Sequence, residues 1–295
     1  MKLGLELAIA TIFVLIWSTG FVIARLAMPY VEPATFLFWR FSGVLAAMAA
    51  LSLVWQMTWP SRSQIKHIAI AGIMLQFGYV MGVWIAVKMG MTAGLVALIV
   101  GLQPILTAWF AAWVSERVTP RQWLGLAFGF AGVALVVASK VGLLHIPLMS
   151  YLLAIVALLS ITFGTIYQKK YCPVFDLRAG TSIQFGISAI LSFFCMLFFE
   201  TGVMVWNPSV IGALLWAIFP ISIGSISLLF MMIRKGAATK VTSFLYLVPP
   251  TTAIMAWMLF DEPFTALMAV GLGLTMTGVV LVNIGQKNTI ATIAE

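Results

Sequence analysis

The chain has 295 residues, of which 63% are hydrophobic and 8% are charged, and its formal net charge at pH 7 is +8. An ordinary soluble domain has roughly 25% charged residues, so this composition excludes a globular protein with a water-facing surface. The basic charge would indicate nucleic acid in a soluble protein. Here its distribution marks membrane topology instead, and we expect no nucleic-acid partner.

Apolar runs of about 20 residues, each long enough to cross a hydrocarbon core of about 30 Å, recur along the whole chain. Backbone groups in lipid must be satisfied within each segment, so every run is predicted to be a helix. The first run continues from Lys2 to Ala27 without a small-residue cleavage site, which indicates an uncleaved helix. The expected fold is an all-α integral membrane protein with ten transmembrane helices, at residues 5–27, 33–55, 67–87, 91–114, 121–139, 147–168, 179–199, 209–233, 237–260 and 265–285.

Lysine and arginine gather at one set of span ends. If the N-terminus is cytoplasmic, twelve of the 16 basic residues fall at inner ends and three at outer ends, with Arg40 inside a span. This bias predicts that both termini are cytoplasmic. The inner-end residues are Lys2, Arg62, Lys66, Arg117, Arg121, Lys169, Lys170, Arg178, Arg234, Lys235, Lys240 and Lys287, and the outer-end residues are Arg25, Lys88 and Lys140.

The chain repeats itself at a fixed offset of 146 residues. "SERVTPRQWLGLAFGFAGVALVV" (115–137) and "DEPFTALMAVGLGLTMTGVVLV" (261–282) share an acidic turn followed by a glycine-rich apolar run. We therefore predict two five-helix units, 1–143 and 144–295, and because five is odd the second unit is inverted in the membrane. Inverted repeats are typical of secondary transporters. The matched pairs include Glu116 with Glu262, Gly125 with Gly271, Gly132 with Gly278, Lys88 with Arg234 and, after a two-residue slip, Arg25 with Lys169.

Three stretches carry a family resemblance: "FVLIWSTGFVIARLAMPYVEPATFLFWRF", "GLVALIVGLQPILTAWFAAWVSERVTPRQWLGLAFGFAGVALV" and "VTSFLYLVPPTTAIMAWMLFDEPFTALMAVGLGLTMTGVVLV". They resemble the drug/metabolite transporter superfamily, in its ten-helix branch with two EamA domains, and within it the YddG-type aromatic amino-acid exporters. The resemblance implies a secondary transporter that exports small metabolites, including aromatic amino acids, across the bacterial cytoplasmic membrane by alternating access. The alternative is efflux of drugs or other small hydrophobic metabolites, with proton coupling as an option.

An amino-acid site needs a donor for the carboxylate, an acceptor for the ammonium group and an apolar wall. Arg40 is the foremost candidate, because an arginine inside a span costs about 2.5–3.5 kcal/mol and normally faces the bundle interior. Its repeat-related position is Gln184, which is also polar and inside a span. The alternative is that Arg40 donates to backbone carbonyls and joins helix ends.

The third, fourth and ninth spans supply further candidates. Gln76 and Tyr79 are three residues apart and lie on nearly the same helix face, with Trp84 beyond them. Two prolines, Pro104 and Pro250, are expected inside helices, where each frees a carbonyl four residues back, at Val100 and Tyr246. Such carbonyls accept either from a substrate ammonium or from a neighbouring helix. The side chain of Gln103 either donates a hydrogen bond into the substrate cavity or forms a hydrogen bond between helices.

The remaining candidates lie within spans, where they would form the aromatic wall of the substrate site or supply hydroxyl groups to it. They are Trp17, Ser18, Phe163, Ser225 and Tyr246, with Trp109 and Tyr167 as further aromatic residues. For each ring taken alone, contact with lipid or core packing is the competing interpretation. The glycines of the fifth and tenth spans allow close helix approach, so those two helices are expected to be scaffolding.

The sequence contains no catalytic constellation, and its two cysteines, Cys172 and Cys195, have no metal-ligand spacing. We therefore expect no enzyme activity, cofactor or metal; the expected partners are a small-molecule substrate and the lipid bilayer, with the protein a monomer. The acidic residues fall at or near span ends, which favours facilitated export over proton antiport. Glu6 is a relay candidate if the first helix begins later.

Overall fold

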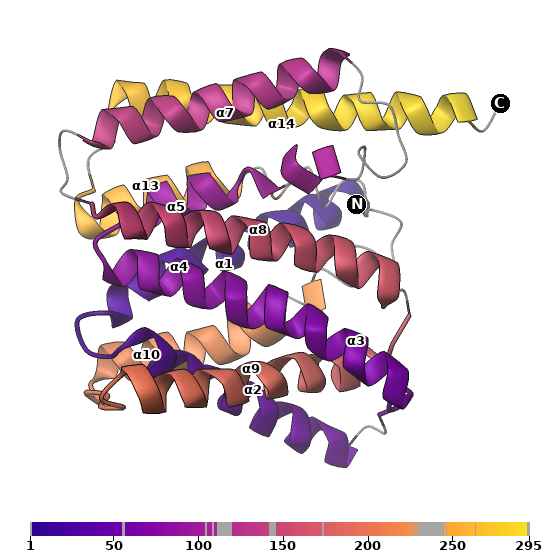
Figure 1. Ribbon diagram of the computed structural model, residues 1–295, viewed down its shortest axis with the longest axis vertical. Coiled ribbons are helices and arrows are strands. Elements are labelled where there is room, and N and C mark those ends of the chain that lie inside the picture. The colour runs from indigo at the N-terminus through magenta and orange to yellow at the C-terminus, as the bar shows by residue number, and fades with distance from the viewer. Residues whose placement is uncertain are drawn as a thin grey trace.

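The computed structural model describes residues 2–54, 57–103, 105–107, 109–110, 120–141, 146–172, 174–225, 227–228, 245, 247–262 and 264–293. Within these residues every named element is a helix (Figure 1). The elements are α1 (Lys2–Ala27), α2 (Pro33–Val54), α3 (Arg62–Gly72), η1 (Ile73–Gly78), α4 (Tyr79–Lys88), α5 (Ala93–Val100), α7 (Pro120–Val141), α8 (Leu148–Tyr171), α9 (Leu177–Phe199), α10 (Pro208–Trp216), η2 (Ala217–Ser225), α13 (Val248–Phe260) and α14 (Ala266–Ile293).

Six of the helical segments are long and apolar enough to cross a membrane. They coincide with the first, second, third, sixth, seventh and eighth predicted spans. Four shorter apolar helices, of 10–17 residues, fall on the remaining predicted spans. The described part of the chain is therefore built from helices, several of which have the length and composition to span a membrane, while the count of ten spans stays a prediction.

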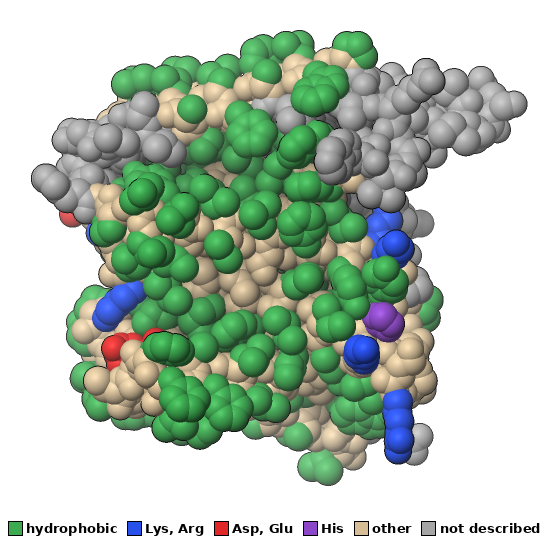
Figure 2. All heavy atoms as spheres, in the orientation of Figure 1, with side chains coloured by type: hydrophobic (Ala, Val, Ile, Leu, Met, Phe, Trp, Pro, Cys, Tyr) green, Lys and Arg blue, Asp and Glu red, His purple; other side chains and the backbone are tan. Residues whose placement is uncertain are grey.

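The outer surface of the bundle is apolar. Figure 2 shows one face covered by hydrophobic side chains, with basic, acidic and histidine side chains on its two flanks. Many large apolar side chains are mostly exposed, among them Leu53, Phe199 and Met258. Such exposure would cause aggregation in water but suits contact with lipid tails. The charged flanks mark the two ends of the bundle.

α7 and α14 form a pair at one edge of the molecule (Figure 1). Gly132 lies in contact with the backbone of Gly271, and Gly278 lies in contact with the backbone of Gly125 and Gly129. A Cβ added at either glycine would overlap those backbone atoms. Because rising numbers on α7 meet falling numbers on α14, the two helices are antiparallel. Small residues at the contact allow this close approach, which drives helix association in lipid.

Helix contacts occur in matched sets. At the repeat offset α1 corresponds to α8, α2 to α9, η1 to η2, and α7 to α14. The contact of α1 with η2 has its counterpart in the contact of α8 with η1. Two further pairs, α2 with α9 and α7 with α14, each join an element to its own counterpart. Two units related by a two-fold axis would pack in this way.

Two π-helical segments interrupt the third and eighth predicted spans. η1 covers Ile73–Gly78 and η2 covers Ala217–Ser225. Adding 146 to the bounds of η1 gives 219–224, which lies inside η2. π-Helical turns are rare and frequently found at functional sites, so their matched positions direct attention to the interior between these two segments.

The α2 and α9 pair is joined at both ends by carboxylates, which we call the carboxylate clasps. At one end Glu200 accepts hydrogen bonds from the backbone N–H groups of Ala34 and Thr35, both at 2.7 Å. There Glu32 accepts from the N–H and hydroxyl of Thr201, both at 2.8 Å. These bonds satisfy donors at the start of α2 and in the loop after α9.

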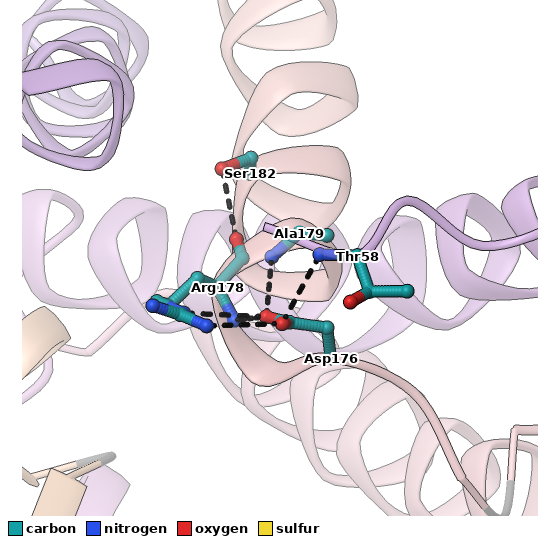
Figure 3. A network of polar contacts seen from close by, with 5 residues as sticks. All are labelled: Thr58, Asp176, Arg178, Ala179 and Ser182. Atoms are coloured by element: carbon teal, nitrogen blue, oxygen red, sulfur yellow. Dashed lines mark hydrogen bonds and ion pairs between the residues drawn. The ribbon is translucent and has the colours of Figure 1, made fainter. Parts of the chain in front are cut away.

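At the opposite end Asp176 is the N-cap of α9 and accepts from the backbone N–H groups of Arg178 and Ala179 (Figure 3). It also accepts from the N–H of Thr58, at 3.3 Å, in the loop after α2. Asp176 is the counterpart of Glu32 at the two-residue slip, an offset of 144. The carboxylates of Glu32 and Asp176 thus hold corresponding positions at opposite ends of one helix pair, and the residues that donate to them match within one position.

Candidate functional site

Arg40 is a charged side chain in the interior of the bundle. It lies on α2, is 7% exposed, and donates from Nε and Nη2 to the hydroxyl of Ser222, both at 3.2 Å. The ring of Phe41 lies 5.8 Å from its guanidinium carbon. Within the described part of the chain, the ion pairs are Arg25 with Glu262 and Arg178 with Asp176, so no carboxylate there neutralises Arg40.

Ser222 lies in η2, in the second half of the chain. Its hydroxyl donates to the carbonyl of Ala217, five residues back, at 2.8 Å, and accepts the two N–H groups of Arg40. Ser222 is itself fully buried. Sequence reasoning did not single it out, although the repeat offset of 146 places it on Gln76, which was a candidate.

Tyr79 begins α4 directly after η1 and lies near enough to Arg40 for the two groups to interact electrostatically. Gln76 lies within η1 and is half-buried, and its side chain makes no hydrogen bond with the described part of the chain. α2, which carries Arg40, contacts both η2 and α4. The interior site combines residues from both halves.

The fourth and ninth predicted spans are both interrupted near their middle. α5 ends at Val100 and is followed by a turn at Gly101, while α13 begins at Val248 after a turn at Leu247. Gly101 sits against the ring of Pro249, where an added Cβ would come within 2.6 Å. The two breaks thus meet, and discontinuous helices of this kind form substrate sites in transporters.

The position of Pro250 corrects one expectation. Pro250 lies in the first turn of α13, where a missing N–H costs nothing, and not inside a continuous helix. The expected kink is therefore a helix start. Pro104 and Tyr246, the other members of that hypothesis, lie outside the described residues.

The remaining polar candidates bond to neighbours other than Arg40. Gln103 donates to the hydroxyl of Thr165 at 3.0 Å, and Gln184 donates to Gln168 at 2.8 Å. Ser18 donates to the carbonyl of Val248, and Ser225 to that of Pro220, each at 3.4 Å. These bonds connect helices or turns of the scaffold, and they do not converge with Arg40.

The aromatic candidates are spread over the bundle. Trp84 is 2% exposed and stacks on Phe36 with ring centroids 4.4 Å apart, as a core residue does. Trp17 packs against Phe13, whereas Phe163 is 41% exposed and contacts Phe110. Trp109 also contacts Phe110, and Tyr167 bonds His67 at 2.8 Å. Of the aromatic residues, Phe41 and Tyr79 are the ones that interact with Arg40 in the described part of the chain.

The arrangement at Arg40 is suited to binding an anion. The guanidinium is buried, it has a neutral hydroxyl as its hydrogen-bond partner, and aromatic side chains lie beside it. A buried charge is costly unless paired, and a carboxylate accepts a bidentate pair of bonds from arginine. Within the described part of the chain no group of three or more histidine, cysteine or acidic side chains is placed to hold a metal ion.

The chain is similar along nearly its whole length to proteins that are named as transporters. A family model described as "EamA-like transporter family" matches residues 4–138 and again residues 148–284. The Bacillus subtilis (strain 168) protein "Uncharacterized transporter YvbV" is 28% identical over 283 residues, covering 93% of this chain and 90% of the relative. The Escherichia coli (strain K12) "Probable amino-acid metabolite efflux pump" is 23% identical over 280 residues, 92% of each.

A third relative, the "Uncharacterized inner membrane transporter YedA" of Escherichia coli (strain K12), is 24% identical over 276 residues, covering 92% of this chain and 88% of the relative. A solved crystal structure is 18% identical and superposes with a TM-score of 0.66, covering 94% of this chain and 96% of its own. At that identity the likeness concerns the fold alone.

Proposed function

This chain belongs to the EamA-like transporter family, and we propose that it exports amino acids, including aromatic ones, across the bacterial cytoplasmic membrane by alternating access. Two relatives support the proposal by their names, one as a probable amino-acid metabolite efflux pump and one as an inner membrane transporter. The chain is a transporter by family; its substrate and its membrane are what we propose.

The observation that carries the proposal is the uncompensated charge of Arg40. A guanidinium in the interior of a membrane protein costs about 2.5–3.5 kcal/mol on insertion scales. In the described residues it has one hydroxyl partner and no carboxylate. An amino-acid carboxylate supplies the missing charge, and the ring of Tyr79 supplies an apolar surface beside it.

The proposed site lies between the halves, which is where alternating access requires it. Arg40 and Tyr79 come from residues 1–143, and Ser222 comes from residues 144–295, the two units that we propose as inverted five-helix repeats. The matched helix contacts and the matched π-helical segments support this division. Because one chain supplies both halves, we propose that the protein works as a monomer.

We propose facilitated export, without a proton relay in the site. The acidic side chains that the structure describes lie at helix ends, where Glu32, Glu200 and Asp176 accept backbone N–H groups. Glu262 is buried, but Arg25 lies 3.2 Å from it and compensates its charge. Both termini are proposed to be cytoplasmic, in accordance with the bias of the basic residues.

Transport by the purified protein in liposomes tests the proposal. Liposomes loaded with unlabelled phenylalanine should accumulate labelled phenylalanine by counterflow, and a panel of other amino acids should compete. Arg40→Gln should slow counterflow roughly tenfold to hundredfold, because bonds to a charged group are worth about 1.5–3 kcal/mol. Arg40→Lys, which keeps the charge but loses the planar fork, should recover part of the loss.

Two results would overturn the proposal. One is counterflow by folded, monodisperse Arg40→Gln at the wild-type rate, which would remove Arg40 from the site. The other is transport of hydrophobic dyes with no competition from any amino acid, which would favour efflux of drugs or other hydrophobic metabolites.

A further inference from the structure

The two bonds between Arg40 and Ser222 occupy one particular edge of the guanidinium. Nε and Nη2 share the lateral edge of the guanidinium, on the side away from Cδ, and both donate to the same hydroxyl oxygen, at 3.2 Å each. The end of the fork, formed by Nη1 and the second hydrogen of Nη2, has no partner in the described part of the chain. Arginine has five N–H donors in a fixed plane, so fixing one edge also fixes the direction of the other.

Ser222 is able to hold that edge because its own orientation is set by the backbone. Its hydroxyl hydrogen is donated to the carbonyl of Ala217 at 2.8 Å, within the π-helical segment η2. With the hydrogen used in this way, the oxygen lone pairs are left for the two N–H groups of Arg40. Ser222 is fully buried, so water does not compete for these bonds.

We propose that Ser222 is a positioning residue that fixes Arg40 by its Nε and Nη2 edge and presents the Nη1 and Nη2 end to a planar carboxylate. This inference rests on the proposed function and specifies which chemical group of the substrate the Arg40 site selects. A carboxylate matches two parallel N–H donors. In the described residues no second cation lies beside Arg40, so the site suits one monoanionic carboxylate and not a phosphate, which would require more positive charge.

A matched pair of ligands tests this selectivity. The probes are L-phenylalanine and L-phenylalaninamide, which differ only at the carboxyl group, measured at mildly acidic pH where both ammonium groups are charged. Half-saturation concentrations for counterflow are compared in wild-type protein, Ser222→Ala and Ser188→Ala. Ser188 is the control, because it is also fully buried and, within the described residues, its hydroxyl donates to the backbone carbonyls of Gly72 and Gln184 and not to Arg40.

The wild-type protein should prefer phenylalanine to its amide by about tenfold or more. Ser222→Ala should raise the half-saturation concentration for phenylalanine about tenfold while leaving that for the amide unchanged, so that the preference disappears. Ser188→Ala should keep the preference. A merely structural role for Ser222 would alter yield, melting temperature or maximal rate for both probes, and would not change their ratio.

The isosteric pair Ser222→Thr and Ser222→Val extends the test to variants of equal volume. Threonine keeps the hydroxyl and should keep the preference, whereas valine should lose it. An unchanged preference in Ser222→Ala or in Ser222→Val would overturn the positioning role. That outcome differs from failure of the proposed function, in which Arg40→Gln itself transports phenylalanine normally.

Discussion

Tyr79 illustrates how a single side chain acquires two roles from its position. It begins α4 after a π-helical segment and lies beside Arg40, while its ring packs against the hydrophobic core. The i, i+3 spacing with Gln76 was visible in the sequence, but the partner on α2 was not. A tyrosine in an apolar run gives no sequence signal of which side faces a charged neighbour.

Replacing Tyr79 should therefore slow the transport of bulky aromatic substrates more than that of small ones. We expect Tyr79→Ala to weaken counterflow of phenylalanine about two- to tenfold, since an aromatic contact contributes about 0.5–1.5 kcal/mol. Threonine should be affected much less, because it has no ring to lose. Competition by each amino acid against labelled phenylalanine measures the difference. Equal losses for both substrates would exclude Tyr79 from the wall of the site.

Asp176 gives a pH prediction for stability. Burial opposes ionisation of its carboxyl group, but hydrogen bonds from Arg178, Thr58 and Ala179 outweigh it and lower its pKa below the usual value. A depressed native pKa stabilises the fold above the unfolded pKa of about 3.9. That stabilisation is lost as the pH falls through the native value.

Asp176→Ala should therefore be less stable than the wild type by about 1 kcal/mol at neutral pH, the usual contribution of an N-cap. The gap in melting temperature between the two proteins should shrink as the pH falls below about 4. Thermal unfolding in detergent across this range measures it. A gap that stays constant down to the lowest pH would mean that the charge of Asp176 contributes nothing.

At the scale of elements, the contact between α7 and α14 depends on glycines whose missing side chains admit the partner backbone. Gly132 faces backbone atoms of Gly271 and Thr275, whereas Gly273 on the same α14 has open space beside it. Gly132→Ala should destabilise the pair by about 1–3 kcal/mol, because backbone cannot move aside. Gly273→Ala should be neutral or stabilising, by up to about 1 kcal/mol.

Melting temperatures of the two glycine variants check this contrast. Transport per folded molecule should be unchanged in both, since these helices are proposed as scaffolding. A Gly132→Ala protein as stable as Gly273→Ala would contradict the close backbone contact.

The carboxylate clasps bear on which elements move. In the opposite-facing state each half is expected to adopt the conformation that the other half has here. The contact at Glu32 would then take the form that the contact at Asp176 has in this structure, and the reverse. Both are formed in this structure, at 2.8 Å and 3.3 Å, so both are expected to be formed in the exchanged state as well. The α2 and α9 pair should then stay closed throughout transport.

A disulfide between Glu32→Cys and Thr201→Cys, with Cys172 and Cys195 replaced by serine, tests this expectation. Crosslinked protein should transport phenylalanine at no less than about half the rate of the same protein after reduction. Arrest on oxidation and recovery on reduction would show that this end of the pair must open.

At the scale of the whole molecule, the sequence predicted the apolar spans and the interior arginine, because hydropathy and charge are properties of the segments themselves. It did not predict the π-helical segments, the breaks at Gly101 and Leu247, or the role of Ser222. These features depend on contacts between halves that lie far apart in the sequence. A serine in an apolar run looks neutral until the arginine that it binds is located.

Topology is the first prediction at this scale. Cysteines introduced at Asn207 and Ser63, in protein lacking the native cysteines, should be labelled from opposite faces of the membrane. Asn207 begins α10 and should react with an impermeant reagent from outside intact cells, whereas Ser63, in the first turn of α3, should react only after lysis. Labelling of both from outside would contradict the proposed arrangement of spans.

Alternating access requires that the Arg40 site is reached from each side of the membrane in turn, and this is measured directly with a thiol reagent. A single cysteine at Tyr79, in protein lacking Cys172 and Cys195, is exposed to an impermeant thiol reagent from one face of a liposome at a time. We predict reaction from either face, with phenylalanine protecting the cysteine in both cases. Reaction from one face only, whatever the direction of the phenylalanine gradient, would contradict alternating access at this site.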